Sequence, residues 1–309
     1  MFAQSHFENS LLYDTKPLGG NRVQTLDEAS LEFETLLDYL KYSRECDLTH
    51  YKRSTLMRRF RHRMQRINID TYENYLQYLQ CDSEEHLALL SDVLINFTGF
   101  FRDYNAWIYL ATEVIPKIID CKPSDEPIRV WSAGCATGAE IYSLLILLAE
   151  VLGVEFCQQR LQCYATDADR DTLHQAQNAT YNDLEILDIP PDLLKKYFRQ
   201  TTKGLTFSPK LRRIVTVKQH DLMKDAPLPA IDLLICRNVL IYFTPEAQNS
   251  ILTRFHSVLN NTGFLFLGHT ELVVHQRQLF TPVSLKQRIY AKGLEPELNR
   301  YPFITAQLG

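Results

Sequence analysis

The spacing of apolar residues divides the chain into a helical first third and a mixed remainder. Apolar side chains recur every three or four positions over 33–40 and again over 56–67, and 72–79 has the same character. This period predicts amphipathic helices. The first part of the chain is therefore expected to be an all-helical unit that ends near Ile95.

A fourth helix of this unit is expected to begin at a capping box. Asp82 and Glu85 have the spacing at which two polar side chains cap a helix N-terminus reciprocally. The apolar residues that follow are expected to face the core of the unit. They are Leu87, Leu90 and Leu94.

After a helix expected over 104–119 and a turn-rich linker over 121–127, strand-like runs alternate with helical ones. Such alternation predicts a parallel α/β sheet. Residues 183–213 are irregular and lie where an inserted subdomain or a lid would be. The expected strands are Ile128–Ser132, Leu161–Thr166, Ile214–Lys218, Ile231–Cys236, Gly263–Gly268 and Gln287–Lys292.

The length of 309 residues allows one large core or two modest ones. We expect two folded domains with tails at both ends. The divisions are a loose tail (1–27), a helical domain (28–95), a linker with one helix (96–127), an α/β domain (128–293, with an insertion near 183–213) and a C-terminal tail (294–309).

The composition, 45% apolar and 23% charged, is that of a water-soluble globular protein. No run approaches the ~20 apolar residues of a membrane span, and residues 4–9 are too polar for a signal peptide. The seven cysteines are scattered without a C-x-x-C spacing. We therefore expect a cytoplasmic protein with reduced thiols, no metal site and no membrane insertion.

A turn of small residues follows the first expected strand and leads into an apolar helical run. Gly134 and Gly138 bracket this turn, which lets the backbone approach a ligand closely. In a doubly wound sheet the ligand crevice opens at this end of the strand. Ala136 breaks the G-x-G-x-x-G pattern, so the turn suits a nucleoside ligand without a pyrophosphate. On this segment alone, a glycine turn in an unrelated α/β fold stays open.

An acidic pair ends the second expected strand. An aspartate at this tip is placed to accept hydrogen bonds from ribose hydroxyls. Asp167 lies 33 positions after Gly134, so the connection is longer than in dinucleotide folds. We interpret Asp167 as the ligand and Asp169 as the cap of the next helix, although the two roles can be exchanged.

Two further polar groups lie where ligand pockets form. Arg237 and Asn238 follow the apolar strand 231–236, and Tyr242 precedes the helix start Thr244-Pro245. Polar residues at the carboxyl end of a central strand favour a site. The alternative for Arg237 is a salt bridge with an aspartate, for which Asp232 and Asp221 are the candidates.

The seam between the expected domains carries Asn96, Thr98 and Arg102 around a Phe-Phe pair. Together these segments resemble the CheR family of chemotaxis-receptor glutamate methyltransferases. The resemblance covers about residues 31–292 and depends on five motifs in order. They are Asn-x-Thr-x-Phe-Phe-Arg, Ser-Ala-Gly-Cys-Ala-Thr-Gly with Glu-x-Tyr-Ser, Thr-Asp-x-Asp, Cys-Arg-Asn-Val-Leu-Ile-Tyr-Phe and Leu-Phe-Leu-Gly-His-Thr-Glu.

The resemblance implies a fold and a cofactor. The fold is a doubly wound, mostly parallel, seven-stranded Rossmann-like α/β sheet, preceded by a small all-helical N-terminal domain. The cofactor is S-adenosyl-L-methionine, with S-adenosyl-L-homocysteine as product. The reaction is methylation of receptor glutamates.

The resemblance also implies roles for individual residues. Asn96, Thr98 and Arg102 would contact the methionyl end of the cofactor, Glu140 its amino group and Asp167 its ribose. Asp221 and Leu222 would flank the adenine, while Gly134, Arg237 and Asn238 would complete the pocket. Arg102 and Tyr242 match the residues that the family sets against the transferred methyl group.

Two positions depart from the family pattern. Ala139 replaces the Glu or Gln that usually precedes the retained Glu140, and Asp221 stands where the family more often has Asn. The second change is expected to weaken a contact to adenine. Since Glu140 is retained, we expect an active enzyme, although a non-catalytic binding module or a methyltransferase for another substrate stays open.

The helical domain carries a basic segment that is expected to choose the partner. Residues 52–66 contain seven lysines and arginines and no acidic residue. Such a surface attracts an acidic partner, and the resemblance implies that this partner is the glutamate-bearing helical bundle of a chemoreceptor. The alternative of a merely solvated basic face stays open. Nucleic acid is disfavoured because the net charge is −4 and no nucleic-acid module is recognised. The expected substrate-binding residues are Arg58, Arg59, Arg61 and Arg63.

In some members of the family a glycine-bearing loop grips a C-terminal receptor peptide. The matching region here, 198–205, is short and has one glycine. We therefore expect an enzyme that acts without this tether. We also expect a monomer.

Overall fold

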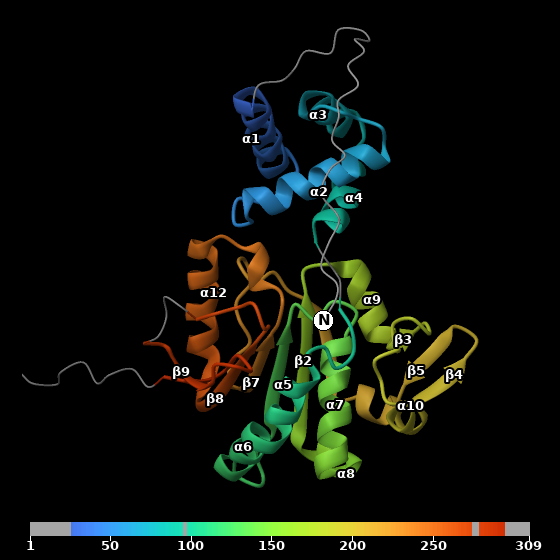
Figure 1. Ribbon diagram of the computed structural model, residues 1–309, viewed down its shortest axis with the longest axis vertical. Coiled ribbons are helices and arrows are strands. Elements are labelled where there is room, and N and C mark those ends of the chain that lie inside the picture. The colour runs from blue at the N-terminus through green and yellow to red at the C-terminus, as the bar shows by residue number, and fades with distance from the viewer. Residues whose placement is uncertain (1–25, 95–97, 274–277, 294–309) are drawn as a thin grey trace, which may run out of the picture.

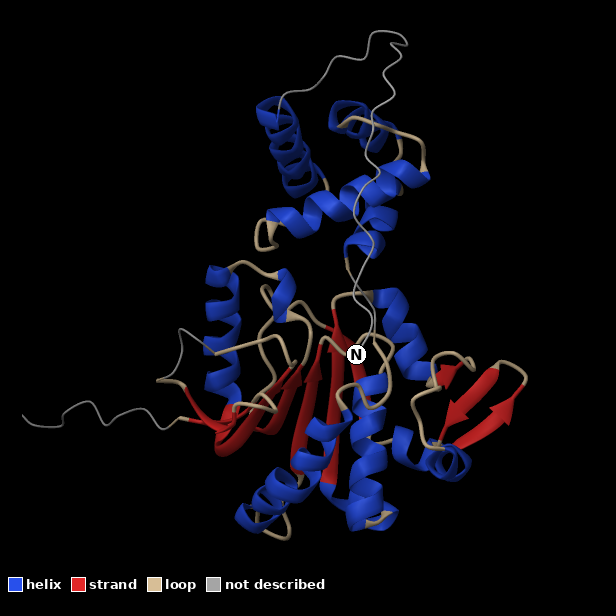
Figure 2. Cartoon of the chain, viewed as in Figure 1, coloured by secondary structure: helices blue, strands red, loops and turns tan. Residues whose placement is uncertain are grey.

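The computed structural model describes residues 26–94, 98–273 and 278–293. Figure 1 shows a small helical unit beside a larger α/β unit. Figure 2 shows the strands gathered in one central sheet with a second, smaller sheet at its side. The helices of the first unit are α1 (Leu26–Ser43), α2 (Arg53–Arg66), α3 (Tyr72–Cys81) and α4 (Glu85–Val93).

The apolar stripes of α1, α2 and α3 form the core of the helical unit, as their spacing predicts. Phe33 and Phe60 are fully buried, and their rings meet edge to face at 5.1 Å between centroids. Tyr75 of α3 packs against Phe60 at 6.3 Å. Edge-to-face pairs of this kind stabilise a core beyond their buried area.

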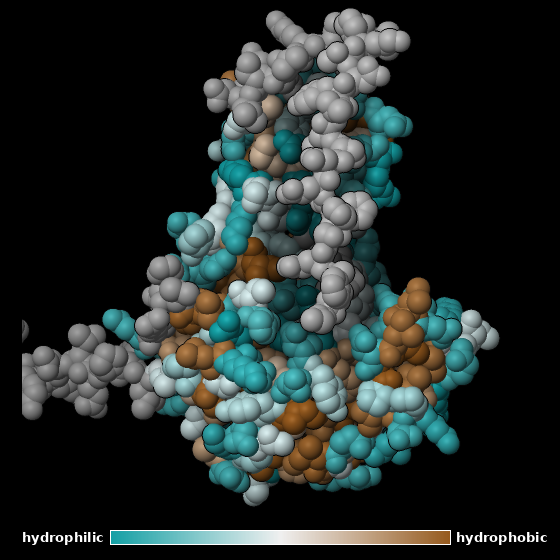
Figure 3. Space-filling view, viewed as in Figure 1, coloured by the Kyte–Doolittle hydropathy of each residue, from teal (hydrophilic) through white to brown (hydrophobic). Residues whose placement is uncertain are grey.

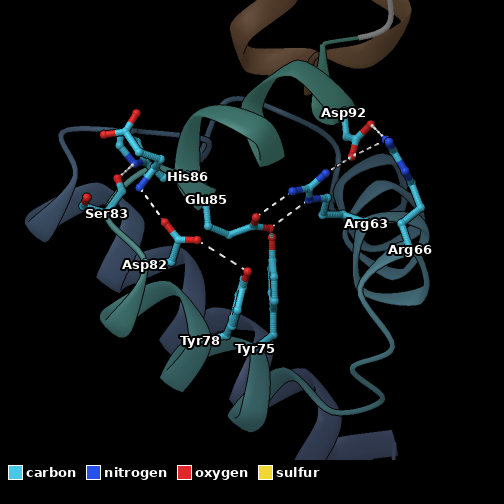
Figure 4. A network of polar contacts seen from close by, with 10 residues as sticks. Arg63, Arg66, Tyr75, Tyr78, Asp82, Ser83, Glu85, His86 and Asp92 are labelled. Carbon is cyan, nitrogen blue, oxygen red and sulfur yellow. Dashed lines mark hydrogen bonds and ion pairs between the residues drawn. The ribbon is translucent and has the colours of Figure 1, made fainter.

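The expected capping box of α4 is wrong, and its expected inward face is right only in part, because Leu90 packs against the core of the unit whereas Leu87 does not. Leu87 is 53% exposed, whereas Glu85, Leu89 and Val93 are buried. Glu85 does not cap the helix, because its carboxylate accepts hydrogen bonds from Arg63 and Tyr75 (Figure 4). This buried charge pair turns α4 so that a different set of residues faces the core.

The central sheet has seven strands in the order β6-β2-β1-β7-β8-β10-β9. The first five are mutually parallel, and β10 and β9 add antiparallel to the β8 edge. The mostly parallel fold is confirmed, while β9 was not among the expected strands. The bounds are β1 (Ile128–Ala133), β2 (Leu161–Asp167), β6 (Val215–Gln219), β7 (Ile231–Cys236), β8 (Leu259–Leu267), β9 (Phe280–Ser284) and β10 (Ile289–Lys292).

Helices cover both faces of the sheet, as Figure 1 shows. Val130 and Trp131 of β1 point to opposite faces and belong to different apolar clusters. The Val130 side packs on α5 (Tyr104–Tyr109), a π-helical turn (Leu110–Val114), α6 (Ile115–Cys121) and α7 (Ala139–Leu152). The Trp131 side packs on α12 (Pro245–Val258). Two shorter helices flank β2, namely α8 (Val154–Arg160) and α9 (Arg170–Asn178).

The irregular segment between α9 and β6 is a small subdomain with its own three-stranded antiparallel sheet, ordered β3-β5-β4. It projects from the side of the α/β unit in Figure 1. Its elements are β3 (Thr180–Tyr181), α10 (Pro191–Tyr197), β4 (Phe198–Thr201), β5 (Gly204–Phe207) and α11 (Pro209–Arg212).

The strand order reverses between β1 and β7, since the chain moves outward to β2 and β6 on one side and to β8 on the other. The carboxyl ends of β1 and β7 therefore form a switch-point crevice, the place where open α/β sheets bind ligands. None of the helices in the described part of the chain combines the length and the apolar character that a membrane span requires.

Candidate active site

One recess opens at the carboxyl ends of β1, β2 and β7, beneath the helical unit. Ten of the eleven expected cofactor and catalytic residues line it, and Asn96 lies outside the described residues. The structure thus brings together side chains from five separate segments of the chain. The ten are Thr98, Arg102, Gly134, Glu140, Asp167, Asp221, Leu222, Arg237, Asn238 and Tyr242.

The glycine turn forms one wall of the recess. Gly134 and Gly138 have φ of 78° and 83°, a left-handed conformation that favours glycine. A Cβ on Gly134 would lie 2.4 Å from a methyl group of Val239. The amide of Gly134 donates to the Thr166 carbonyl at 2.7 Å, which fixes the turn to the end of β2.

Two aspartates lie at the carboxyl end of β2, and the one expected to cap the next helix does so. Asp169 is the N-cap of α9 and accepts from the Asp171 amide at 2.8 Å. Asp167 lines the recess and accepts from the amides of Ala136 at 2.8 Å and Asp169 at 3.0 Å. Burial raises the pKa of Asp167. Each of its oxygens keeps a lone pair with which to accept a further hydrogen bond.

Glu140 lies in the first turn of α7 with its carboxylate in the recess. Ser132 Oγ donates to Oε1 at 3.0 Å, and Arg237 Nη1 lies 3.7 Å from Oε2. Burial raises the pKa of Glu140 to about 7, although the charge of Arg237 acts in the opposite direction. A ligand ammonium beside this carboxylate would favour its ionised form.

Arg237 does not form the alternative salt bridges considered from the sequence. Its Nη2 donates to Asp103 Oδ2 at 2.6 Å, and its guanidinium lies 5.3 Å from the ring centroid of Trp107 and 4.7 Å from that of Phe266. Asp232 is instead paired with Lys122 at 3.1 Å. The buried guanidinium therefore connects the switch-point crevice with the turn that carries Arg102.

Asp221 also lines the recess. The Oδ1 of Asp221 accepts from the Met223 amide at 2.8 Å, and the backbone amide of Asp221 donates to Asp225 Oδ2 at 2.8 Å. These bonds hold the turn that also presents Leu222 to the recess. His220, the preceding residue, is buried beside Trp131.

Glu271 is a structural part of the site that sequence reasoning missed. Its carboxylate accepts from four backbone amides, at 2.6 to 2.9 Å. Three of these amides belong to the Asn238–Leu240 turn, and Asn238 has a φ of 59°. The buried carboxylate therefore holds a left-handed turn in place. A glutamate in an apolar-flanked Gly-His-Thr-Glu run gives no signal of such a role.

Tyr242 ends a short 3-10 helix, η2 (Leu240–Tyr242), at the rim of the recess. Burial raises its pKa, while the charges of Arg59, Arg102 and Arg58 lower it. The rim of the recess is therefore cationic around Tyr242, with contributions from both the α/β unit and α2.

Arg63 does not belong to this rim, contrary to the expectation for the basic segment. Its side chain is 15% exposed and donates to Glu85 at 2.6 and 2.8 Å, with Asp92 at 3.5 Å (Figure 4). Burial of the charged partner Glu85 explains this placement, because a buried carboxylate requires a partner. Arg58 and Arg61 are exposed, and Arg59 is half-buried.

Two family models match the chain over most of its length. The model described as the SAM-binding domain of CheR methyltransferase matches residues 96–289. The model described as the all-alpha domain of CheR methyltransferase matches residues 31–94. The two matches coincide with the α/β and helical units.

Individual proteins are similar over most of the chain. A chemotaxis protein methyltransferase of Escherichia coli K12 is 31% identical over 76% of this chain and 82% of its own length. One from Listeria innocua is 30% identical over 77% of this chain and 91% of its own. An uncharacterized 104.1 kDa protein of Rhodobacter capsulatus is 34% identical over 84% of this chain, which spans 27% of that protein.

Proposed function

The chain belongs to the CheR methyltransferase family, and from that premise we propose that it methylates glutamate side chains of chemoreceptors in the cytoplasm. It is an S-adenosylmethionine-dependent methyltransferase. The observation that supports a carboxylate acceptor is the positive charge that acts on Tyr242, to which Arg59, Arg102 and Arg58 contribute. An anionic acceptor is attracted to this positive charge, whereas a cationic one is repelled.

Different residues of the recess suit the adenosine part and the amino-acid part of the cofactor. Asp167 carries oxygens that can accept from ribose hydroxyls, beside Asp221 and Leu222 for the adenine. Glu140 offers a buried carboxylate to the amino group, with Thr98 and Arg102 nearby on the same wall. S-adenosylmethionine, when bound, supplies a methyl group on a sulfonium, which an oxygen nucleophile displaces in line.

The acceptor needs alignment more than activation. A glutamate with the usual pKa of ~4.3 is already ionised near neutral pH, so no general base is required. Arg102 is placed to hold this carboxylate bidentately, and Tyr242 to orient it at the rim. Holding both reactants in a near-attack geometry can supply ~7–11 kcal/mol of the barrier reduction.

The helical unit would select the partner. We propose that Arg58, Arg59 and Arg61 of α2 bind the acidic side of a receptor helix and present its glutamate to the recess. Figure 3 shows a mostly hydrophilic surface where the helical unit is visible, as suits contact with a charged helix. Arg63 is left out of this role, since it is paired within its own unit.

The test is product chemistry. The protein is incubated with methyl-labelled S-adenosylmethionine and receptor-containing membranes, and volatile methanol is measured after alkali. Carboxyl methyl esters release methanol in base, whereas N-methyl and C-methyl products do not. Receptors whose candidate glutamates are replaced by alanine serve as the matched control. Alkali-stable label, or no label although S-adenosylhomocysteine binds, would contradict the proposal.

A further inference from the structure

The helical unit contributes one aromatic residue to the recess. Tyr51 lies in the segment between α1 and α2, and it lines the recess together with Asp167, Asp221 and Phe243. The ring of Tyr51 stacks on Phe243 with 4.7 Å between centroids and 29° between planes. A residue of the partner-binding unit therefore forms part of the cofactor pocket.

Backbone hydrogen bonds fix this segment to the turn that carries Tyr242. Tyr51 and Phe243 form an antiparallel bridge. The Lys52 amide donates to the Tyr242 carbonyl at 2.9 Å, and the Thr244 amide donates to the His50 carbonyl at 2.9 Å. Lys52 Nζ also donates to the Ile241 carbonyl, at 2.8 Å. The position of Tyr51 is therefore set by the α/β unit.

The hydroxyl of Tyr51 lies at the acidic end of the recess. Burial raises its pKa, and the nearby carboxylates of Asp221 and Asp167 act in the same direction. Within the part of the chain that the structure describes, this hydroxyl makes no hydrogen bond. Tyr51 is half-buried and lines the recess, so its hydroxyl can meet a ligand that enters there. A ligand that accepts or donates a hydrogen bond would give this hydroxyl a partner.

We propose that the Tyr51 hydroxyl hydrogen-bonds to the nucleoside part of the cofactor, so that cofactor binding fastens the helical unit onto the turn that carries Tyr242. The acidic neighbours of the hydroxyl, Asp167 and Asp221, assign the contact to the adenosine end and away from Glu140. The inference rests on the cofactor site alone. It holds whichever acceptor the enzyme methylates.

The test combines two variants with two ligands and reads binding by calorimetry. Tyr51→Phe removes the hydroxyl but keeps the stack on Phe243, and Glu140→Gln alters the opposite end of the recess. The ligands are S-adenosylhomocysteine and 5′-methylthioadenosine, which lacks the amino-acid end. Tyr51→Phe should weaken both ligands by the same factor, about three- to tenfold for one lost hydrogen bond. Glu140→Gln should weaken only the first.

The controls separate a contact from a loosened fold. Tyr42→Phe alters a tyrosine that is 77% exposed on α1 and should leave both affinities unchanged. The thermal midpoint of the ligand-free protein should be the same for Tyr51→Phe and the wild type. Wild-type affinity of Tyr51→Phe for both ligands would overturn the proposal, as would a loss seen with S-adenosylhomocysteine only.

Amide hydrogen exchange would measure separately whether cofactor binding stabilises the contact between the helical and α/β units. S-adenosylhomocysteine should slow exchange at the Lys52 and Thr244 amides, whose bonds join the two units. At ligand saturation this slowing should be at least threefold smaller in Tyr51→Phe. Exchange that cofactor leaves unchanged at both amides in the wild type would overturn the coupling between the recess and the helical unit.

Discussion

The side chain of Arg237 holds the backbone of Arg102. Its Nη2 donates to the Arg102 carbonyl at 2.9 Å, and Trp107 Nε1 donates to the same oxygen at 2.9 Å. The residues on either side, Phe101 and Asp103, have φ of 49° and 61°. Arg237 therefore stabilises a turn with two left-handed residues and so sets the direction of the Arg102 side chain.

Arg237→Lys should lower turnover by about tenfold or more. A lysine is a point donor on a flexible stem and cannot reproduce the planar contacts to Asp103, to the Arg102 carbonyl and to the flanking rings. Losing one or two hydrogen bonds to a charged group costs about 1.5–3 kcal/mol each. Steady-state kinetics with the receptor would measure kcat. Arg199→Lys, an exposed site on β4, is the control, and a kcat within twofold of wild type would contradict the role.

Arg102→Ala should lower turnover far more than cofactor affinity. The guanidinium is proposed to hold the acceptor carboxylate, whose alignment contributes mainly to the transition state. We expect kcat to fall about a hundredfold or more, while the dissociation constant of S-adenosylhomocysteine changes by less than about fivefold. Single-turnover rates and calorimetry would measure the two effects. An unchanged rate would remove Arg102 from the mechanism.

Cofactor affinity should rise with pH because of Glu140. Its pKa of about 7 in the ligand-free recess means that it is mostly protonated below that pH. A ligand ammonium favours the ionised form, so binding below pH 7 must release a proton. Affinity should therefore increase about five- to tenfold between pH 6 and pH 7.5.

Calorimetry of S-adenosylhomocysteine binding in two buffers of different ionisation enthalpy would count the protons released. Glu140→Gln should bind more weakly and lose the pH dependence over this range. Ser257→Ala, an exposed serine on α12, serves as the control and should retain the full slope. A Glu140→Gln variant that keeps the wild-type slope would assign the proton to another group.

The sequence predicts what depends on local spacing and on strand ends. The helical periods of α1 and α2, five parallel strands and the Asp169 cap follow from short segments. So does the convergence of polar groups at one crevice, because parallel strands end at the same edge of a sheet. The left-handed conformation of Gly134 and Gly138 is also indicated by the sequence, because both glycines lie in a turn of small residues.

The features that the sequence does not predict depend on contacts between distant residues. Arg237 lines the recess as expected, but its partner is Asp103, 134 positions away, and neither of the aspartates considered as alternatives. Glu85 faces inward because Arg63 lies 22 positions before it on α2, and this removes Arg63 from the basic surface. Strand β9 contains Pro282 and lies at the sheet edge, where a proline is tolerated but conceals the strand pattern.

Glu85→Gln should destabilise the helical unit. The Glu85 side chain is 3% exposed and accepts from Arg63 and Tyr75, so its neutralisation leaves Arg63 with a weaker partner (Figure 4). Breaking a buried charge pair costs about 3–5 kcal/mol, and we expect about half of this here, since Asp92 remains beside Arg63. Urea unfolding followed by circular dichroism would measure the loss. Glu84→Gln, at an exposed neighbour, should change stability by less than about 0.5 kcal/mol.

Charge reversal on α2 should separate partner binding from chemistry. Arg58→Glu is expected to raise the KM for receptor about tenfold, because the cationic rim attracts the acidic helix over a distance and favours its encounter. The affinity for S-adenosylhomocysteine should stay unchanged, since Arg58 does not line the recess. Initial rates over a range of receptor concentrations would give KM and kcat.

The same reversal should make the reaction less sensitive to salt. Attraction between exposed charges is screened beyond ~10 Å at 0.1 M ionic strength, so the wild-type KM should rise with salt more steeply than that of Arg58→Glu. Lys117→Glu changes the net charge equally at an exposed position of α6, at the opposite end of the α/β unit in Figure 1. If both reversals raise KM to the same extent, net charge and not the α2 surface attracts the receptor.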